Sequence, residues 1–440
     1  MSKATKQRLG IFALMAICLA VGYLFASSKV QITFGQPTQT IEKKPTKVAQ
    51  VGKKPGKGGF KFTPQWRDPN NPNVTILDKD WDVHYRRRDS SKDPKREPGP
   101  FSLQRYEHPF SQTAFPSVLG VPVALTPEDL KAGKVDVAIV GIPNQDNPSG
   151  GQAWAPNQMR VIRTIDYAHS GNDSYLNINY FEKLNVVDYG NASYNPLLAG
   201  QNNEEHAKVL GEILDAGATF IGIGGDHSTE ASCLLAMYKK FGPKNFAIVH
   251  FDAHHDVYKG SMGAFVHGGR QRRWAYENGW LKGEDMISVG MRTPYGDPKI
   301  LKWQQMVGER YHYMAEFDRD GFDTVFKRIL KEVKGKRLYI SFDMDAIDPA
   351  HVCGISNPEP GGFTSKQAIT MLRGLAMQND VAGIEFTEYS PLLDDNHYNT
   401  AIVMDRLMRA FLAGKAARKM GITDPHYVAP EMLNHGQRGK

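Results

Sequence analysis

Cysteine is scarce in this chain, with three residues among 440. Cys18, Cys233 and Cys353 show no C-x-x-C spacing and form no even set, so we expect no structural disulfide. We interpret Cys233 and Cys353 as small buried hydrophobes rather than as reactive thiols. So few cysteines leave the redox compartment of the protein open.

The sequence also lacks any signature of a nucleic-acid-binding fold. Its formal net charge is +7, and much of that excess lies in the first hundred residues, including the run Arg86-Arg87-Arg88. A basic patch can mark nucleic acid or an anionic membrane as a partner. Without a nucleic-acid signature, we interpret these charges as a solvated tail beside a membrane segment and expect no nucleic-acid partner. The composition, 41% hydrophobic and 23% charged, is that of a globular protein.

An apolar stretch near the N-terminus predicts targeting. Residues 9–26 are almost uninterrupted in their hydrophobicity and follow Lys3, Lys6 and Arg8. A positive flank before an apolar centre is typical of an export signal, and this length also suffices for a short membrane anchor. We therefore predict an exported, periplasmic or extracytoplasmic protein, or one that residues 1–28 anchor to the membrane if they are not cleaved.

Composition divides the rest of the chain into four segments. Residues 29–59 are rich in Lys, Gly, Pro and Thr, which predicts a flexible basic linker. Residues 60–114 carry several aromatics among many prolines, and we interpret them as an irregular N-terminal arm that packs onto a folded body, its own or a neighbour's. Residues 115–425 are predicted to form the main folded domain, and residues 426–440 a C-terminal tail.

Short apolar strands alternate with longer amphipathic helices in the main domain. Strands are predicted over residues 135–141, 184–188, 219–224, 246–251, 286–290, 337–342 and 381–386. Helices are predicted over residues 204–216, 228–241, 321–333, 365–377 and 399–420. Such alternation predicts an α/β fold with a mostly parallel sheet covered by helices on both faces. Functional groups in such sheets gather at the carboxyl ends of the strands.

Acidic and imidazole side chains follow four of the predicted strands. Asp252, His254 and Asp256 alternate directly after residues 246–251, so in an extended segment all three can face the same way. The other three strand ends carry His227, the pair Asp343 and Asp345, and Glu388. Clustered carboxylates repel one another unless a cation lies among them. The pattern therefore predicts a metal site at this edge of the sheet.

Six of these side chains are candidate metal ligands, namely His227, Asp252, His254, Asp256, Asp343 and Asp345. Four carboxylates and two imidazoles without thiolates suit harder divalent ions, Mn²⁺ first, with Ni²⁺, Co²⁺ and Fe²⁺ as alternatives. Six ligands with this acidic excess suit two cations, which would lower the pKa of a bridging water and supply hydroxide as a nucleophile.

These motifs resemble the signatures of the ureohydrolase family, which includes arginase and agmatinase. The matching stretches are GGDHS at residues 224–228, FDAHHD at 251–256 and SFDMDAIDP at 341–349, in family order within residues 115–414. The resemblance implies a three-layer α/β/α sandwich, a binuclear Mn²⁺ site held by the six candidate ligands, and hydrolysis of a guanidino compound to urea and an amine. It also implies a homo-oligomer, a trimer or a hexamer.

The resemblance assigns roles to further residues. Glu388 matches the carboxylate that pairs with the substrate guanidinium, and His267 matches the histidine that passes a proton to the leaving amine. We therefore predict His267, Glu388 and Asp256 as the catalytic residues. Asp226 and Asp348 are expected to hold turns or to orient ligands from behind.

Three loops depart from the family's usual pattern. They cover residues 143–151, 257–260 and 349–362, and they line the tail of the substrate rather than its guanidinium. We therefore expect the chemistry to be retained while the substrate stays open among agmatine, another guanidino acid or amine, and free guanidine. Arginine is the least expected substrate. His255 has no assigned role and is expected to be an exposed loop histidine.

Two other functions stay open. A relative on the same fold could hydrolyse a different C–N bond, such as that of a formimino group or an acetylated amine. Alternatively, an exported protein without catalytic activity could reuse the fold and bind a partner through its aromatic arm. The presence of all six candidate ligands together with Glu388 and His267 favours a hydrolase of linear amidines.

Overall fold

The structure, a computed structural model, forms two compact units, residues 1–87 and residues 88–440. It describes residues 67–68, 71–75, 95–103, 115–145, 155–165, 170–194, 199–259, 269–294 and 297–433. In the first unit, β1 (Arg67–Asp68) pairs antiparallel with β2 (Asn71–Thr75). The second unit contains the large sheet on which the candidate site is built.

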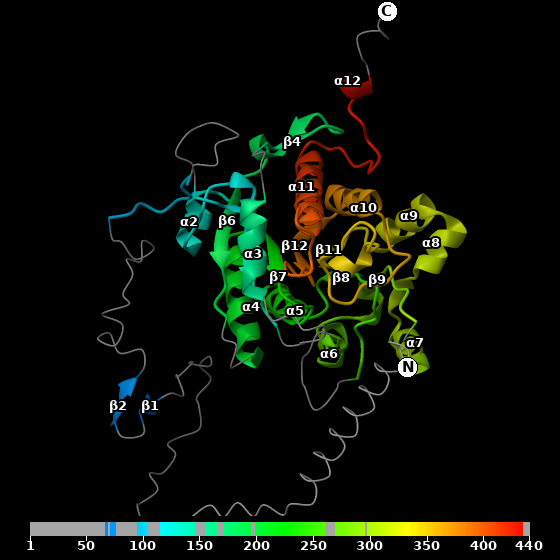
Figure 1. The fold of residues 1–440 in the computed structure, drawn as a ribbon, viewed down its shortest axis with the longest axis horizontal. Coiled ribbons are helices and arrows are strands. Elements are labelled where there is room, and N and C mark those ends of the chain that lie inside the picture. The colour runs from blue at the N-terminus through cyan, green and yellow to red at the C-terminus, as the bar shows by residue number, and fades with distance from the viewer. Residues whose placement is uncertain are drawn as a thin grey trace, which may run out of the picture. The chain divides into compact units, whose positions relative to one another are not determined.

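Eight strands form this sheet (Figure 1). In spatial order they are β10 (Arg310–His312), β9 (Met286–Val289), β8 (Ala247–Phe251), β11 (Arg337–Asp343), β12 (Asp380–Thr387), β7 (Thr219–Gly224), β3 (Val137–Ile142) and β6 (Val186–Asn191). Every pairing between neighbours in this sheet is parallel. Strands β3, β7 and β8 are buried along their whole length, which explains why they read as continuous apolar runs.

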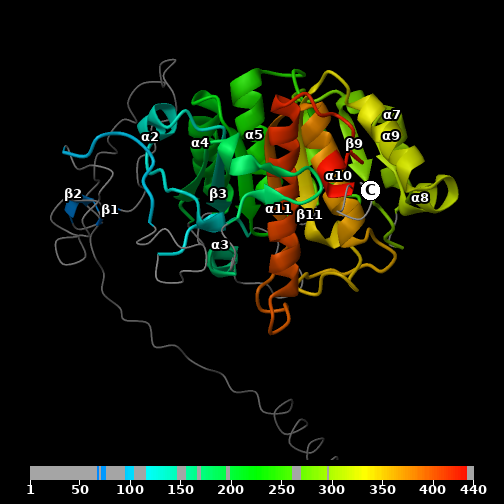
Figure 2. The same cartoon turned by 90° about the horizontal axis from the view of Figure 1, so that it is seen from above.

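Helices cover both faces of the sheet, as the predicted three-layer α/β/α arrangement requires (Figure 2). One face carries α3 (Ala155–Thr164), α8 (Met314–Asp320), α9 (Phe322–Glu332), α10 (Ser365–Gln378) and α11 (Asn399–Lys419). The other face carries α2 (Pro127–Ala132), α4 (Ala199–Asp215), α5 (Thr229–Phe241), α6 (Gln271–Glu277) and α7 (Pro298–Val307). Shorter elements include β4 (Asn172–Asp173), β5 (Ile178–Asn179), the 3-10 helices η2 (Val118–Gly120), η4 (Tyr180–Glu182), η5 (Gly283–Asp285) and η6 (Met344–Ala346), and α12 (Pro430–Leu433).

Local signals determine where the helices begin and end. The Thr364 hydroxyl accepts a hydrogen bond from the backbone N–H of Gln367 at 3.2 Å, and the Gln367 side chain accepts from the N–H of Thr364 at 2.9 Å. This reciprocal pair satisfies N–H groups that α10 itself leaves free. Helix α7 starts at Pro298 behind the capping side chain of Asp297, and Gly308 ends it in the left-handed conformation.

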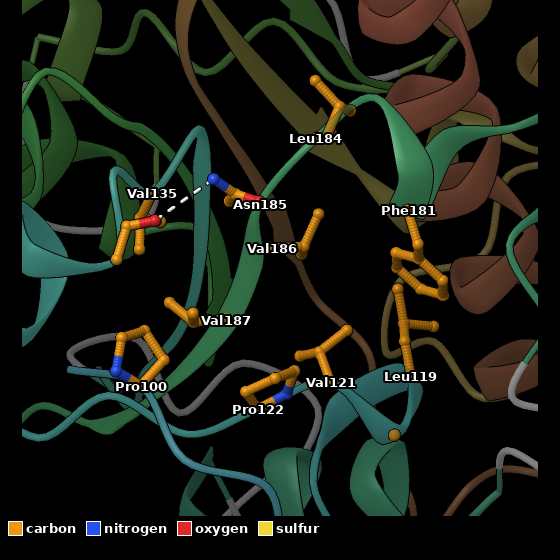
Figure 3. Close-up of a pocket in the computed structure, with 12 residues that line it drawn as sticks. Pro100, Leu119, Val121, Pro122, Val135, Phe181, Leu184, Asn185, Val186 and Val187 are labelled. Carbon is orange, nitrogen blue, oxygen red and sulfur yellow. Dashed lines mark hydrogen bonds between the residues drawn. The ribbon is translucent and has the colours of Figure 1, made fainter.

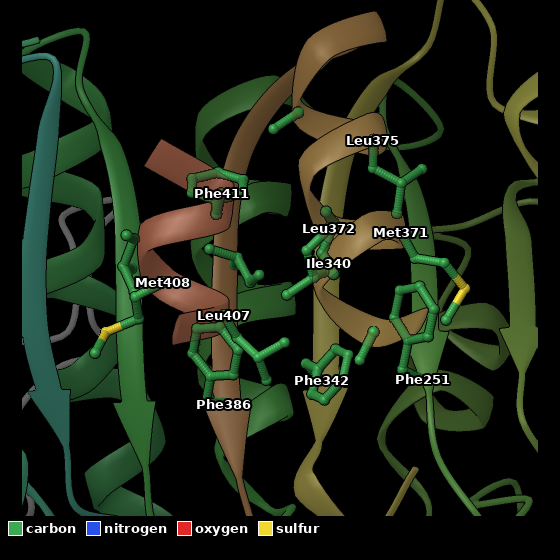
Figure 4. Close-up of a cluster of buried hydrophobic side chains, with 14 of the residues drawn as sticks. Phe251, Ile340, Phe342, Met371, Leu372, Leu375, Phe386, Leu407, Met408 and Phe411 are labelled. Atoms are coloured by element: carbon green, nitrogen blue, oxygen red, sulfur yellow. The ribbon is translucent and has the colours of Figure 1, made fainter. Parts of the chain in front are cut away.

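Aromatic side chains of the central strands pack against α10 and α11 (Figure 4). The ring of Phe342 on β11 lies 5.1 Å from that of Phe251 on β8 and 5.7 Å from that of Phe386 on β12. Met371 of α10 and Leu407 of α11 belong to the same fully buried cluster. This close packing holds the three strands in fixed register, and the candidate ligands follow directly at the carboxyl ends of these strands.

Seven of the eight strands of the large sheet were predicted from the sequence, with ends displaced by a few residues. Helix α4 begins at Ala199 rather than at residue 204, and β6 runs on to Asn191. The edge strand β10 and the helices α2, α3, α6, α7, α8 and α12 were not predicted. Strand β10 has three residues, too few to show a hydrophobic period.

The prediction of an exported or membrane-anchored protein is wrong. Within the described ranges, no helix has both the length and the apolar character needed to cross a membrane. The apolar stretch over residues 9–26, on which that prediction depended, lies outside the described residues, as do residues 29–59.

Part of the predicted N-terminal arm joins the second unit. Phe101 forms an antiparallel bridge with Val123. The Arg96 guanidinium donates to both carboxylate oxygens of Asp129 at 2.8 and 2.9 Å. Burial opposes the charge of Asp129, but the Arg96 hydrogen bond and backbone N–H donors outweigh it and lower the pKa of the carboxyl to about 2.

Candidate metal centre

The six predicted ligands lie at the carboxyl ends of neighbouring central strands. His227 follows β7, Asp252 follows β8, Asp343 ends β11, and Asp345 lies in η6. Strands β8, β11, β12 and β7 are consecutive in the sheet. Side chains that are far apart in the sequence therefore meet at one place, as the strand-end pattern predicted.

The first cluster consists of His227, Asp252, Asp256 and Asp343. The Nδ1 atom of His227 lies 3.2 Å from Asp252 Oδ2, 3.0 Å from Asp343 Oδ2 and 3.4 Å from Asp256 Oδ2. All four residues are buried. Asp256 has a φ of 44°, a left-handed conformation that is uncommon for a non-glycine residue.

The second cluster consists of His254, Asp252 and Asp345. The Nδ1 atom of His254 lies 2.9 Å from Asp345 Oδ2 and 3.4 Å from Asp252 Oδ1. Asp252 therefore belongs to both clusters, with Oδ2 toward His227 and Oδ1 toward His254. A carboxylate that turns one oxygen to each of two histidine-containing clusters has the arrangement of a bridging ligand.

The His227 ring shows that the first cluster suits a cation. Its Nδ1 atom is buried without a hydrogen-bond partner among the described residues, although three carboxylates surround it. Its Nε2 atom lies 2.9 Å from the Ser341 hydroxyl, which donates to Glu385 Oε1 at 2.6 Å. With Nε2 donating to Ser341, Nδ1 would offer its lone pair to a cation held among the carboxylates. A lone pair and three carboxylates at one point form the donor set of a divalent cation.

Neighbouring charges shift the pKa of the residues in both clusters. Burial opposes the charged form of His227 and of His254, but hydrogen bonds and charges from neighbouring carboxylates outweigh it and raise the pKa of both rings. Burial raises the pKa of Asp256 and of Asp343, and the charge of Asp252 adds to the effect at Asp256 and the charges of Asp345 and Asp252 at Asp343. A divalent cation would displace these protons, so metal binding at this site releases protons to the solvent.

Glu388 lies beside the first cluster, and hydrogen bonds fix both its backbone and its carboxylate. Its backbone has a φ of 63°, and its N–H donates to the Gly225 carbonyl at 2.9 Å. The carboxylate accepts from the His227 N–H at 2.8 Å through Oε1 and from the Ser356 hydroxyl at 2.7 Å through Oε2. Burial, with 8% of the residue exposed, raises the pKa of Glu388. A cation beside this carboxylate would favour its ionised form.

Replacing Ser356 tests whether its hydroxyl positions Glu388. A hydrogen bond to a charged group contributes about 1.5–3 kcal/mol. Ser356→Ala is therefore expected to raise KM for the predicted guanidino substrate by about 10-fold while metal content stays unchanged. Ser365→Ala is the matched control, because the Ser365 hydroxyl lies 3.5 Å from His351 Nδ1, which belongs to neither cluster. A KM that changes equally in both variants would show that Ser356 has no such role.

The two supporting aspartates hold turns as predicted. Asp226 Oδ1 accepts from the N–H of Ser228 at 3.0 Å, which shapes the turn that presents His227. Asp348 Oδ2 accepts from the N–H of Gly361 at 2.6 Å and so closes the loop over residues 349–362.

The remaining predictions concern two histidines, His267 and His255, and the cysteines Cys233 and Cys353. His267 lies outside the described residues, so its predicted proton transfer stays a prediction. His255 is not an exposed loop histidine but is buried, with its ring 5.6 Å from that of Tyr313. Cys233 is buried as predicted, whereas Cys353 is exposed, because its loop turns it outward beside Asp394.

Several buried polar residues beneath the clusters were not predicted from the sequence. They are Glu230, His250, Arg272, Ser288, Glu309, Ser341 and Glu385. His250, Ser341 and Glu385 lie inside apolar strands, where a polar residue carries no pattern that separates it from the core. Only the side-chain contacts of the folded chain identify these residues as neighbours of the ligands.

A cavity of about 460 Å³ lies elsewhere in the second unit (Figure 3). Leu119, Val121, Phe181, Val186 and Val187 are among its lining residues. Val186 and Val187 begin the edge strand β6, whereas the clusters follow the carboxyl ends of central strands. The cavity is therefore not part of the candidate metal centre.

Known proteins resemble this chain in sequence and in fold. The sequence profile of the Arginase family matches residues 135–414. Agmatinase from Citrobacter koseri is 30% identical over 317 residues, which cover 72% of this chain and 97% of that protein. Guanidinobutyrase from Pseudomonas aeruginosa is 29% identical over 306 residues, which cover 67% of this chain and 91% of that protein. The solved structure of proclavaminate amidino hydrolase from Streptomyces clavuligerus aligns with a TM-score of 0.62 at 25% identity, covering 71% of this chain and 99% of that one.

The chain belongs to the arginase family. The resemblance to ureohydrolases, and to agmatinase-like members in particular, is thereby confirmed. Membership of this family indicates a hydrolase of C–N bonds.

Proposed function

We propose that this protein is a binuclear-metal amidinohydrolase that hydrolyses a guanidino compound to urea and an amine. The observation that carries the proposal is the pair of clusters that share Asp252, with the buried carboxylate of Glu388 beside them. This combination offers a cation-binding centre next to a fixed partner for a cationic substrate. Agmatine is the first substrate to test, because agmatinases are among the relatives with the highest coverage.

In this proposal, His227, Asp256 and Asp343 hold one divalent ion, His254 and Asp345 hold the other, and Asp252 serves both. Oxygen and imidazole donors without thiolate favour Mn²⁺, with Ni²⁺ and Co²⁺ as alternatives. Two such ions would supply a water of lowered pKa as the nucleophile near neutral pH. The protein's contribution is a dry, rigid ligand set.

The substrate guanidinium would pair with Glu388. A planar guanidinium forms two parallel hydrogen bonds with a carboxylate, and a buried carboxylate forms them more strongly than an exposed one. The predicted role of His267 is to give a proton to the leaving amine. A homo-oligomer, either a trimer or a hexamer, remains part of the proposal.

The alternative is hydrolysis of another C–N bond on the same fold, including that of free guanidine, a guanidino acid or a formimino group. The loop over residues 349–362 departs from the usual family pattern and also supplies Ser356 to Glu388. Because the sequence of this loop differs, the chemical identity of the substrate's tail stays open. The contacts of Glu388 favour a guanidinium as the group that is hydrolysed. A non-catalytic binding protein would have no need for the buried clusters.

Urea release tests the proposal. Purified protein loaded with Mn²⁺ or with Ni²⁺ is incubated with agmatine, guanidinobutyrate, arginine and guanidine, and urea is measured. We expect metal-dependent urea release from at least one of them, strongest for agmatine and weakest for arginine. Protein treated with a chelator is the control. Protein that binds no divalent metal and releases no urea from any of the four would favour the non-catalytic alternative.

A further inference from the structure

Beneath the clusters lies a row of buried ionisable side chains that the proposed reaction does not use. We call His250 of β8, Glu230 of α5, Arg272 of α6 and Glu309 the buried charge row, and all four are buried. His250 Nδ1 lies 3.2 Å from Glu230 Oε1, and Arg272 Nε lies 3.8 Å from the same oxygen. Arg272 Nη1 also donates to Glu309 Oε1 at 2.9 Å. Nitrogen donors therefore alternate with carboxylates along the row.

The buried charge row contacts the metal centre through His250. The Nε2 atom of His250 lies 2.8 Å from Asp252 Oδ2, the oxygen that also faces His227. The rings of His250 and His227 stack, with centroids 4.7 Å apart and an interplanar angle of 6°. Rotation of the Asp252 carboxylate would break the His250 contact, and it would also move Oδ1 away from His254.

We propose that His250 and Glu230 are positioning residues of the metal centre. His250 donates from Nε2 to Asp252 and so keeps one carboxylate oxygen toward each cluster, and Glu230 holds the His250 ring from its other nitrogen. Carboxylate and histidine partners behind metal ligands orient those ligands and commonly raise metal affinity about 10–100-fold. This inference rests on the proposed metal centre.

Two other interpretations of the buried charge row are weaker. Apolar side chains of similar volume would fill the same space without the desolvation penalty of buried charges, so packing alone does not explain the row. His227, Glu230 and His250 also lie close enough together to hold an ion. However, the Arg272 guanidinium already supplies a positive charge to Glu230, and His250 Nε2 is engaged with Asp252.

The test measures Mn²⁺ affinity by competition with a chelating dye, together with the gain in Tm that Mn²⁺ produces. His250→Ala is expected to weaken Mn²⁺ binding about 10–100-fold and to reduce the metal-dependent gain in Tm. His250→Gln is expected to restore most of the affinity, because its amide N–H₂ can donate to Asp252 in place of Nε2. Glu230→Gln is expected to weaken binding less than His250→Ala does.

His206→Asn is the matched control. His206 is a buried histidine of α4 whose Nε2 atom contacts the Ser193 carbonyl at 2.8 Å, and Ser193 belongs to neither cluster. The His206→Asn variant is expected to lower the Tm of metal-free and metal-loaded protein equally and to leave Mn²⁺ affinity unchanged. His250→Ala behaving in the same way would overturn the positioning role.

Failure of this inference differs from failure of the proposed function. Wild-type protein that binds no divalent cation would overturn the proposed function and the inference together. Wild-type protein that binds two ions, with unchanged affinity in His250→Ala, would overturn the inference alone. If His250→Ala does not fold, the Mn²⁺ affinity of Glu230→Gln is the test instead. Unchanged Mn²⁺ affinity in Glu230→Gln would also overturn the positioning role.

Discussion

Asp252→Asn is expected to reduce metal-dependent urea release by about three orders of magnitude or more. Asp252 is the only one of the six candidate ligands that faces both clusters, with Oδ2 3.2 Å from His227 Nδ1 and Oδ1 3.4 Å from His254 Nδ1. The amide keeps the size of the side chain but removes its charge and one acceptor oxygen. Because metal ions stabilise transition-state charge by several kcal/mol, and about 1.4 kcal/mol corresponds to tenfold in rate, loss of the centre removes several powers of ten.

Metal analysis separates this effect from unfolding. We expect wild-type protein to hold two divalent ions per chain and Asp252→Asn to hold fewer, with the remaining sites binding more weakly. Asp129→Asn provides the control, because Asp129 is an equally buried aspartate whose partner is Arg96 at 2.8 Å. That variant should lose stability and keep both metal content and turnover. Asp252→Asn protein with wild-type activity and two bound ions would show that the ligand assignment is wrong.

The strand-end pattern predicted that the candidate ligands meet at one edge of the sheet, but not how they divide into two clusters. Alternation after β8 predicted that Asp252, His254 and Asp256 face the same way. The strand ends at Phe251, however, and the chain then bends, with Asp256 in the left-handed region. His254 consequently joins Asp345, whereas Asp256 joins His227. Side-chain alternation holds only while the backbone stays extended, and backbone bends are not visible in a hydrophobic pattern.

The fold was predictable because the signals that determine it are local. Apolar runs such as β7 and amphipathic stretches such as α9 each carry their own period, and β7 was predicted with both of its ends correct. The buried charge row has no such signal. His250 and Glu230 are 20 positions apart and meet only because β8 lies under α5 in the folded chain. A polar residue within an apolar strand gives no indication of its partner.

Glu388→Gln is expected to lower kcat/KM for a guanidino substrate by about 100-fold or more while both metal ions stay bound. Each hydrogen bond between charged partners contributes about 1.5–3 kcal/mol, and a guanidinium on a carboxylate forms two of them. The glutamine amide also turns N–H donors toward a ligand that itself carries only N–H donors. The left-handed backbone at position 388 and the contacts of this side chain with His227 and Ser356 hold it in place. The substitution therefore acts on charge rather than on position.

The same variant distinguishes the guanidinium reaction from cleavage of another C–N bond. If Glu388 binds a guanidinium, Glu388→Gln should lower kcat/KM by a similar factor for agmatine and for guanidinobutyrate, because the two share that group and differ in the tail. A neutral amide or acetylated amine offers no cation to Glu388, so its hydrolysis should change little. Glu332→Gln, which removes a carboxylate 3.1 Å from His312, is the control and should leave every substrate unaffected. An equal loss of metal from Glu388→Gln and Asp252→Asn protein would instead place Glu388 among the metal ligands.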